Sequence, residues 1–224
     1  QPRSRGLGDV YKRQDLFLEP KGTVIKRPST AIGKWTQSYW RSFRLSHWLG
    51  NDSVDIYHGL SNELPYGIHR TSIRSVMTVH DLIFLERPEL YKPFDRYVYR
   101  KKVEYGARAA TRIIAVSNQT KQDIVRILDV EESKINVVYQ GCHRQFYRRV
   151  TPETLNDTRQ QFALPGQYLL YVGTIEERKN LLKIVQALHE GEIDFPLVVV
   201  GRRTPYFNQV KSYIDRHQMK QVHF

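Results

Sequence analysis

Apolar residues form short runs along the chain from about residue 55 onward, and these runs alternate with longer amphipathic stretches. Several runs are apolar at nearly every position, which is typical of parallel strands that are covered on both faces. We expect strands at VDIYHG, IRSVMTVHD, TRIIAVS, INVVYQG, YLLYVG and FPLVVVG, and helices at residues 94–110, 118–128, 151–162, 181–190 and 205–217. This alternation predicts a doubly wound α/β architecture with right-handed crossovers.

Residues 34–49, upstream of the first expected strand, have the pattern of a helix rich in aromatic residues. Trp35, Tyr39 and Phe43 recur at steps of four residues, and Trp48 lies on a neighbouring row of the same helix. A stripe that faces the core explains this spacing, and we prefer it to an aromatic platform for a ligand.

A domain boundary is expected after the strand that ends in Gly141. A polar and basic segment follows this glycine, and Thr151 then begins a helix with proline in its first turn. We therefore predict two α/β domains, residues 15–147 and residues 148–224, that face each other across a cleft. Proteins of this class bind ligands in the crevice at the carboxyl ends of the strands.

Both ends of the chain have the pattern of cut segments. Residues 1–14 have no amphipathic period and no methionine start, and we expect them to be a non-native leader. Residues 222–224 have the pattern of a strand that is beginning. We expect the first domain to be incomplete at its start and the second to be truncated.

Composition limits the classes of protein and of partner. The 224 residues are 40% hydrophobic, which is typical of a globular chain, and no apolar run approaches the roughly 20 residues that span a bilayer. A single cysteine allows no intramolecular disulfide, so a reducing cytoplasm is expected. The net charge of +12 favours phosphate-bearing ligands, anionic lipid or nucleic acid as partners.

The segment YLLYVGTIEERKN combines a strand, a glycine and two cations before a helix. Gly173 allows a close approach of the backbone, and the helix N-terminus that follows attracts anions. Arg178 and Lys179 lie beside this N-terminus, and Asn180 has the position of its N-cap. Because Glu176 and Glu177 partly offset the charge, an ordinary α/β turn and a phosphate site are equally open on residue chemistry alone.

Two further segments place polar groups at strand ends. His80 and Asp81 follow SVMTV, where the imidazole would contact a sugar hydroxyl and the carboxylate would orient it. The alternative is that Asp81 caps the next turn and His80 bonds to backbone, and sequence alone favours it. Ser117 caps the helix at residues 118–128, which is compatible with ligand contact.

The polar loop in IYHGLSNELP is a fourth segment of this kind, although its composition is also that of an ordinary connector. Zinc-ligand spacing, a GxSxG elbow and a GxxxxGK[ST] loop are all missing from the sequence. Metal and hydrolase sites are therefore not expected.

Taken together and in order, several segments of the chain resemble the family 4 glycosyltransferases of the GT-B fold. These segments are VDIYHGLSNELP, TVHDLIFLERPELY, RIIAVSNQTKQDI, INVVYQGC, YLLYVGTIEERKNL and LVVVGR. The resemblance covers residue 16 to the end. It implies two Rossmann-like domains, the first for the acceptor and the second for the donor. It also implies transfer of a hexose, often mannose, from a GDP- or UDP-sugar with retention, and it implies no metal or cofactor.

The resemblance also assigns roles to residues. Among the donor-binding residues, Gly173 would offer backbone to the diphosphate, and Thr174 beside it belongs to the same set. Arg178 with Lys179 would neutralise the diphosphate as charge develops on the leaving group. His80 with Asp81 would lie at the reacting sugar. Ser117 and Gly201 complete the expected donor-binding set.

The chain departs from the family pattern at several points. Thr174 replaces a common arginine, and YQGCHRQF replaces an asparagine-glycine-valine motif. The early glycine-rich loop and the later pair of glutamates do not occur. We therefore expect this 224-residue chain to be inactive by itself.

Several hypotheses follow. The first is a fragment of a cytoplasmic glycosyltransferase that builds polysaccharide on a glycan or lipid-linked acceptor. Its peripheral contact with the anionic inner face of the membrane would be made by Arg96, Arg100, Lys101 and Arg108. A solvated helix face explains these cations as well. A nucleotide-sugar epimerase of similar architecture is the second. A nucleic-acid binder is the third, and it is disfavoured because the cations are dispersed and no RNA motif occurs.

Overall fold

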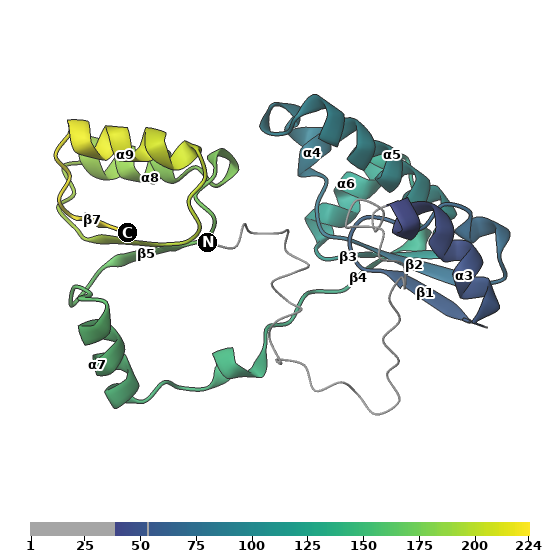
Figure 1. The fold of residues 1–224 in the computed structure, drawn as a ribbon, viewed down its shortest axis with the longest axis horizontal. Coiled ribbons are helices and arrows are strands. Elements are labelled where there is room, and N and C mark those ends of the chain that lie inside the picture. Colours follow the sequence, from purple (N-terminus) through teal and green to yellow (C-terminus); the bar gives the residue numbers. More distant parts are fainter. Residues whose placement is uncertain (1–38, 53) are drawn as a thin grey trace. The chain divides into compact units, whose positions relative to one another are not determined.

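The computed structural model describes residues 39–52 and 54–224 (Figure 1). The expected leader at residues 1–14 and the residue Trp35 lie outside the described part. Of the described residues, 39–52, 54–55 and 65–73 form one compact unit, and residues 56–64 with 74–224 form the other. The second unit contains two separate parallel sheets, so we describe three parts in turn.

The small unit consists of a π-helical turn η1 (Trp40–Arg44), the helix α3 (Leu45–Asn51) and the 3-10 turn η2 (Ile68–Arg70). Two serines join the helix to the loop before η2: Ser46 Oγ donates to the carbonyl of Tyr66 at 2.7 Å, and the carbonyl of Ser42 accepts from Tyr66 N at 2.7 Å. Both serines are buried. Small side chains on this face therefore allow the loop to lie close to the helix.

Two aromatic residues of the expected stripe lie on the outside, whereas Trp48 on the neighbouring row is half-buried. Tyr39 and Phe43 are 60% and 52% exposed, and the ring of Phe43 stacks on Tyr66 with centroids 4.9 Å apart. The expectation that these two rings face the core is wrong, because Ser42, Leu45, Ser46 and Leu49 take the buried face instead.

The first sheet has four parallel strands in the order β1 (Ile56–Gly59), β2 (Arg74–Val79), β3 (Arg112–Ala115) and β4 (Ile135–Val137). Met77 pairs with Ile113, which pairs in turn with Ile135. All three are buried, as expected for strands that are apolar at successive positions. The order and the parallel direction agree with the predicted crossovers.

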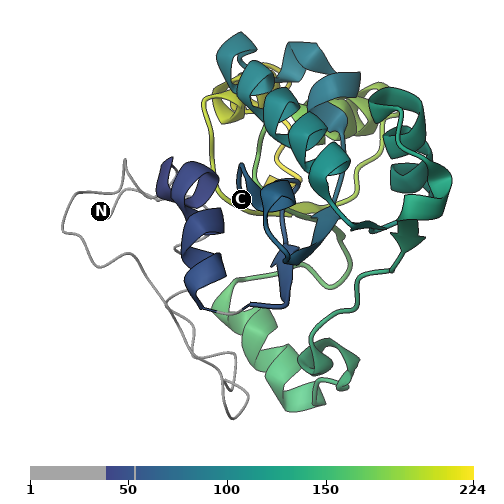
Figure 2. The same cartoon turned by 90° about the vertical axis from the view of Figure 1, so that its right-hand side faces the viewer.

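The helical segments of the first sheet are α4 (Ile83–Glu86), η3 (Pro88–Leu90), α5 (Pro93–Ala109), α6 (Asn118–Leu128) and η4 (Glu132–Lys134). The helix α5 packs on β2, and it needs glycine there: a Cβ on Gly106 would lie 2.5 Å from Met77 Sδ. Figure 2 shows α5 and its neighbours from the side.

A lysine closes the C-terminal end of α5. Lys134 Nζ donates to the carbonyl of Ala107 at 2.8 Å and to that of Arg108 at 3.0 Å, where a helix leaves carbonyls without partners. Burial lowers the pKa of this ammonium.

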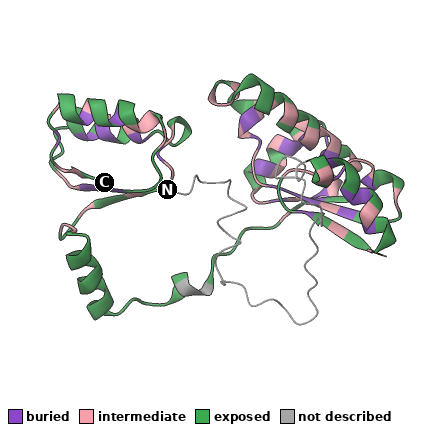
Figure 3. Cartoon of the chain, viewed as in Figure 1, coloured by how far each residue is buried: buried purple, intermediate pink, exposed green. Residues whose placement is uncertain are grey.

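The segment that follows holds η5 (Arg144–Tyr147) and α7 (Pro152–Gln161). Thr151 Oγ1 accepts from Thr154 N at 3.2 Å, so the predicted N-cap is confirmed. No residue of α7 is buried (Figure 3).

The second sheet has three parallel strands, β5 (Leu169–Val172), β6 (Leu197–Val200) and β7 (Val222–His223). The helices α8 (Leu181–Glu190) and α9 (Tyr206–Arg216) cover one of its faces, and the 3-10 turn η6 (Glu177–Lys179) precedes α8 (Figure 1). Their core contains Leu181, Val185, Leu188, Leu197, Val199, Val210 and Ile214. The predicted α/β class is therefore confirmed, and α6 and α8 have the predicted bounds.

Candidate functional site

In the first sheet, His80 follows β2 directly and has a partner at each ring nitrogen. Its Nε2 lies 2.8 Å from the carbonyl oxygen of Leu60, and its Nδ1 lies 3.1 Å from Nε2 of Gln140. A carbonyl oxygen accepts only, so Nε2 carries the proton and Nδ1 accepts from the amide. In this arrangement Nε2 is the donor of the ring and Nδ1 is its acceptor.

Asn62 holds the backbone around His80. Its Oδ1 accepts from His80 N at 2.9 Å, and its Nδ2 donates to the carbonyl of Asp81 at 3.1 Å. Its own N–H donates to the carbonyl of Thr78. Asn62 has a left-handed backbone with φ of 55°, which asparagine tolerates better than most residues.

Asp81 and Ser117 both make the capping contacts that the sequence indicates; for Asp81 this was the alternative to a role at the sugar, whereas for Ser117 it is compatible with ligand contact. Asp81 Oδ1 accepts from Ile83 N at 3.2 Å at the start of α4, and Ser117 Oγ accepts from Thr120 N at 3.0 Å at the start of α6. Thr120 Oγ1 in turn donates to the carbonyl of His80 at 3.2 Å. The capping groups therefore also fix the loop that carries His80.

In the second sheet, Gly173 and Gly201 lie at the ends of the neighbouring strands β5 and β6. A Cβ on Gly201 would lie 1.7 Å from the carbonyl oxygen of Gly173, so no side chain fits there. Lys179 covers the other glycine, since its Nζ lies 2.9 Å from where a Cβ of Gly173 would be. Gly173 also has φ of 153°, a conformation that favours glycine.

The N–H of Gly173 is not available to a ligand, because it donates to the carbonyl of Val200 at 2.9 Å. Thr174 N has no hydrogen-bond partner among the described residues. Of the two residues, Thr174 therefore has the open backbone donor. The sheet ladder, which continues one residue past β5, is the cause. The expectation that Gly173 offers backbone to a diphosphate stays a prediction.

The two expected cations of this turn, Arg178 and Lys179, differ in whether they form an ion pair. Arg178 Nη2 pairs with Glu176 Oε1 at 2.8 Å, and both side chains are about one-third exposed. Lys179 has no ion-pair partner in the part of the chain that the structure describes. Lys179 is thus the cation that is open to an incoming anion.

Asn180 occupies the predicted N-cap position of α8, but its side chain accepts no capping bond. Its left-handed backbone, with φ of 52°, turns the chain there instead. The hydroxyl of Tyr206 takes over the capping role and accepts from Leu182 N at 3.3 Å. Sequence reasoning missed Tyr206, because it lies 24 residues away at the start of α9.

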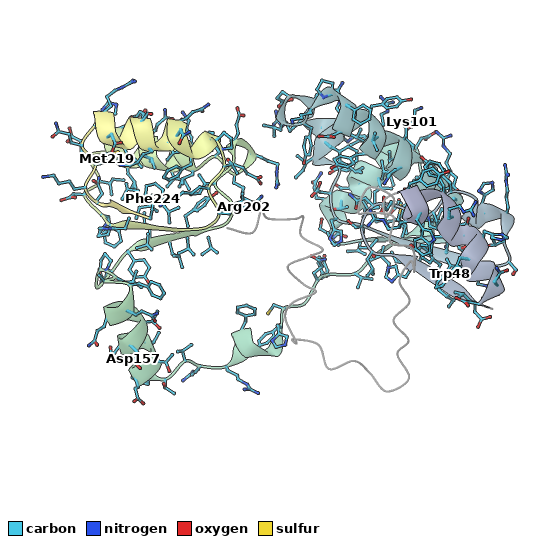
Figure 4. The ribbon with its side chains drawn as sticks, viewed as in Figure 1. Trp48, Lys101, Asp157, Arg202, Met219 and Phe224 are labelled. Atoms are coloured by element: carbon cyan, nitrogen blue, oxygen red, sulfur yellow. The ribbon has the colours of Figure 1, made fainter. Side chains whose placement is uncertain are left out.

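The loop after β6 lies against the same turn. Ile175 N donates to the carbonyl of Arg202 at 2.8 Å, and Thr204 Oγ1 donates to the carbonyl of Ile175 at 2.6 Å. Arg202, labelled in Figure 4, and Arg203 therefore lie near the turn and add positive charge to it. Arg203 also stacks its guanidinium on Phe207, 4.5 Å from the ring centroid. Neither arginine was among the expected site residues.

Within the described ranges, no cluster of three or more histidine, cysteine or acidic residues has the geometry of a metal site. None of the helices of the described chain is long and apolar enough to cross a membrane.

Comparison with known proteins identifies the family. The sequence model of Glycosyltransferase Family 4 matches residues 10–146, which is more than half of the chain. The chain belongs to glycosyltransferase family 4. This family 4 protein is 32% identical over 174 residues to O-antigen chain mannosyltransferase B of Escherichia coli, covering 72% of the chain and 44% of the relative.

A second relative is the serotype-specific mannosyltransferase WbdA of Escherichia coli, which is 24% identical over 161 residues, or 68% of the chain and 20% of the relative. The family 4 chain thus spans less than half the length of these curated relatives.

Solved structures confirm the fold. A glycosyltransferase from Rickettsia africae aligns with a TM-score of 0.57 at 20% identity, over 88% of this chain and 53% of that chain. HepE of Anabaena, in complex with UDP, aligns with a TM-score of 0.59 at 18% identity, over 81% and 51%. WaaG, described as a glycosyltransferase of lipopolysaccharide biosynthesis, aligns with 0.57 at 16%, over 90% and 55%. The GT-B fold expected from the sequence is confirmed.

Proposed function

We propose that the protein transfers a hexose, with mannose as the expected sugar, from a GDP- or UDP-sugar to a glycan or lipid-linked acceptor with retention. Two curated relatives are named mannosyltransferases, and HepE was solved with UDP. The observation that carries the proposal is the position of Lys179: an ammonium without an ion-pair partner in the described chain, folded over Gly173.

Charge is the main requirement of this reaction, since negative charge develops on the departing diphosphate. Lys179 and the N–H of Thr174 supply two donors for it. Arg178 supplies a third when the diphosphate competes with Glu176, whose carboxylate now holds the guanidinium. Gly201 and Gly173 keep side chains out of the space beside them.

The imidazole of His80 is the group that we assign to the transferred sugar. Its Nδ1 accepts from Gln140 in the present arrangement, so it can accept from a hydroxyl instead when the exposed side chain of Gln140 gives way. Asp81 and Ser117 act on the loop through their capping bonds.

Donor binding tests the first step. Calorimetry of this chain with GDP, UDP, GDP-mannose and UDP-glucose should show binding of at least one nucleotide that Lys179→Met weakens. Lys220→Met removes the same charge at an exposed position elsewhere in the second sheet, and should leave the affinity unchanged. Equal affinities in both variants would contradict the assignment of Lys179.

Transfer is tested with the protein expressed from its full reading frame, a panel of labelled GDP- and UDP-sugars, and a glycan acceptor. The expected product carries the sugar with unchanged anomeric configuration. An altered donor sugar without any acceptor would instead identify an epimerase, and no turnover of any donor would end the enzymatic proposal.

A partner surface belongs to the same proposal, namely contact of α5 with an anionic membrane. The solvent-facing row of α5 holds Phe94, Tyr97, Lys101 and Arg108, at steps of three, four and seven residues. Phe94 and Tyr97 are 76% and 60% exposed, and Lys101 Nζ lies over the Tyr97 ring. Aromatic rings beside cations are the composition of interfacial helices.

Two of the four expected cations do not belong to this row. Arg96 and Arg100 project from other sides of α5, and Arg100 pairs with Glu104 at 2.6 Å. The contact that we propose rests on the aromatic residues together with Lys101 and Arg108. The proposal includes a cytoplasmic location at the inner face of the membrane.

Sedimentation with phosphatidylcholine vesicles, with and without phosphatidylglycerol, tests this contact. We expect binding only to the anionic vesicles, and loss of binding in Phe94→Ser/Tyr97→Ser. Phe162→Ser changes an equally exposed ring outside α5 and should bind as the original chain does. Binding to DNA with a steep salt dependence, and none to vesicles, would favour the nucleic-acid hypothesis instead.

A further inference from the structure

Two consecutive residues after β4, Tyr139 and Gln140, form side-chain hydrogen bonds to the α6 helix and to the loop after β2. Tyr139 accepts at its hydroxyl from Asn118 Nδ2 at 3.1 Å, and Gln140 donates to Nδ1 of His80 at 3.1 Å. Both residues are exposed, and they precede η5 and α7. We call residues 139–168, between β4 and β5, the connecting segment. Its start therefore contacts the imidazole that we propose to contact the transferred sugar.

The chemistry of the two ring contacts is complementary. The carbonyl of Leu60 requires a proton on Nε2, and this leaves a lone pair on Nδ1 that only a donor can satisfy. The amide N–H of Gln140 is such a donor. Each contact thus favours the tautomer that the other requires, and together they fix the ring about both of its side-chain torsions.

The two contacts differ in how easily they break. The Leu60 carbonyl belongs to the backbone of the loop after β1, whereas the Gln140 amide is at the end of a flexible, exposed side chain. A displacement of the connecting segment therefore removes the amide first and frees Nδ1, while the Nε2 contact remains.

We propose that Gln140 is a positioning residue that holds His80 in one tautomer and orientation, and that it makes the state of this imidazole depend on the connecting segment. The effect on transfer rests on the proposed function. The effect on the ring does not, because it follows from the two contacts alone.

The direct test is a long-range ¹H–¹⁵N spectrum of the chain with ¹⁵N-labelled histidine at about pH 8, where ordinary imidazoles are neutral. His80→Gln assigns the signals. We expect Nε2 of His80 to carry the proton and Nδ1 to have the shift of a hydrogen-bonded acceptor. Gln140→Leu should shrink the separation of the two nitrogen shifts, since the ring loses one of its anchors.

Gln140→Glu replaces the hydrogen-bond donor that faces Nδ1 of His80 with an acceptor. A carboxylate accepts only, so it should draw a proton onto Nδ1 and give both ring nitrogens the shift of a protonated nitrogen. Tyr139→Phe is the matched control, since it breaks the neighbouring contact of the same segment and keeps the Gln140 amide. It should leave the His80 signals unchanged, and His80 signals that are the same in Gln140→Leu as in the original chain would overturn the proposal.

A transfer assay on the full reading frame adds a kinetic readout. Gln140→Leu should lower kcat roughly tenfold, because the ring is then no longer held beforehand in the orientation in which the sugar hydroxyl replaces the amide at Nδ1. Gln140→Asn keeps the amide on a shorter side chain and should restore part of the rate. No turnover by the original protein would overturn the proposed function while the spectra still decide the role of Gln140.

Discussion

The turn that carries His80 follows the largely buried strand β2, and the turn from Gly173 to Lys179 follows the more exposed strand β5. The two turns are also stabilised in different ways. Side chains from three other segments hold the first turn: Asn62, Thr120 and Gln140. In the second, backbone contacts with the loop after β6 are prominent, namely the close approach of Gly173 to Gly201 and the bond from Ile175 N to Arg202, with Thr204 Oγ1 adding a side-chain bond.

The difference matches what each turn is proposed to do. Hydrogen bonds between neutral groups are directional, so a set of them can fix one tautomer of a ring. A diphosphate needs charge and open N–H groups, which a turn closed by its own side-chain bonds would not offer. An imidazole is therefore preorganised in one turn, and a cation with a free backbone donor is left open in the other.

The largest expected effect is on the backbone contact of the second turn. Gly201→Ala places a Cβ within 1.7 Å of the Gly173 carbonyl oxygen and should lower the free energy of unfolding of the second sheet by about 3 kcal/mol or more. Hydrogen exchange at the amides of β5 and β6 measures it. Gly166→Ala, where nothing lies within 4 Å, should change little.

The next effect separates the two cations of that turn. Lys179→Met should weaken nucleoside diphosphate binding by about 10- to 100-fold, the size expected for a charge-assisted hydrogen bond. Arg178→Met should cost less, because Glu176 already holds the guanidinium. Calorimetric titration gives both values, and a larger loss in Arg178→Met would reverse our ranking of the cations.

A smaller effect is expected from the side chains of the first turn. Asn62→Ala removes two hydrogen bonds around His80 and puts alanine in a left-handed conformation, which together should lower the free energy of unfolding by about 2 kcal/mol. Urea unfolding measures it. Asn62→Asp keeps the acceptor for His80 N and should lose less, and an unchanged midpoint in Asn62→Ala would show that the turn does not depend on this side chain.

The smallest effect concerns pH and the first sheet alone. Burial lowers the pKa of Lys134, so the native chain releases this proton at a lower pH than the unfolded chain does. The free energy of unfolding should therefore rise slightly with pH from that lowered pKa up to the ordinary lysine value. Lys134→Met should remove the rise, which urea unfolding at a series of alkaline pH values detects, and Lys220→Met should keep it.

Much of the fold could be predicted because it is encoded by neighbouring residues. The expected bounds of α6 and α8 agree with the structure, since periodicity and end signals lie within each helix. The aromatic residues Tyr39 and Phe43 show where this reasoning fails: their spacing identified the helix but not its buried face, which Ser42 and Ser46 take because a loop lies against it.

The sequence by itself determined the parallel α/β class, the family and the residues at strand ends, because these follow from local periodicity and from motifs in a given order. Only the tertiary structure decided which atoms meet there. Leu60 and Gln140 reach His80 from 20 and 60 residues away. The β5–β6 ladder takes the N–H of Gly173 and leaves that of Thr174 open. Strand register and the reach of single side chains set such contacts, and neither is written in the neighbouring residues.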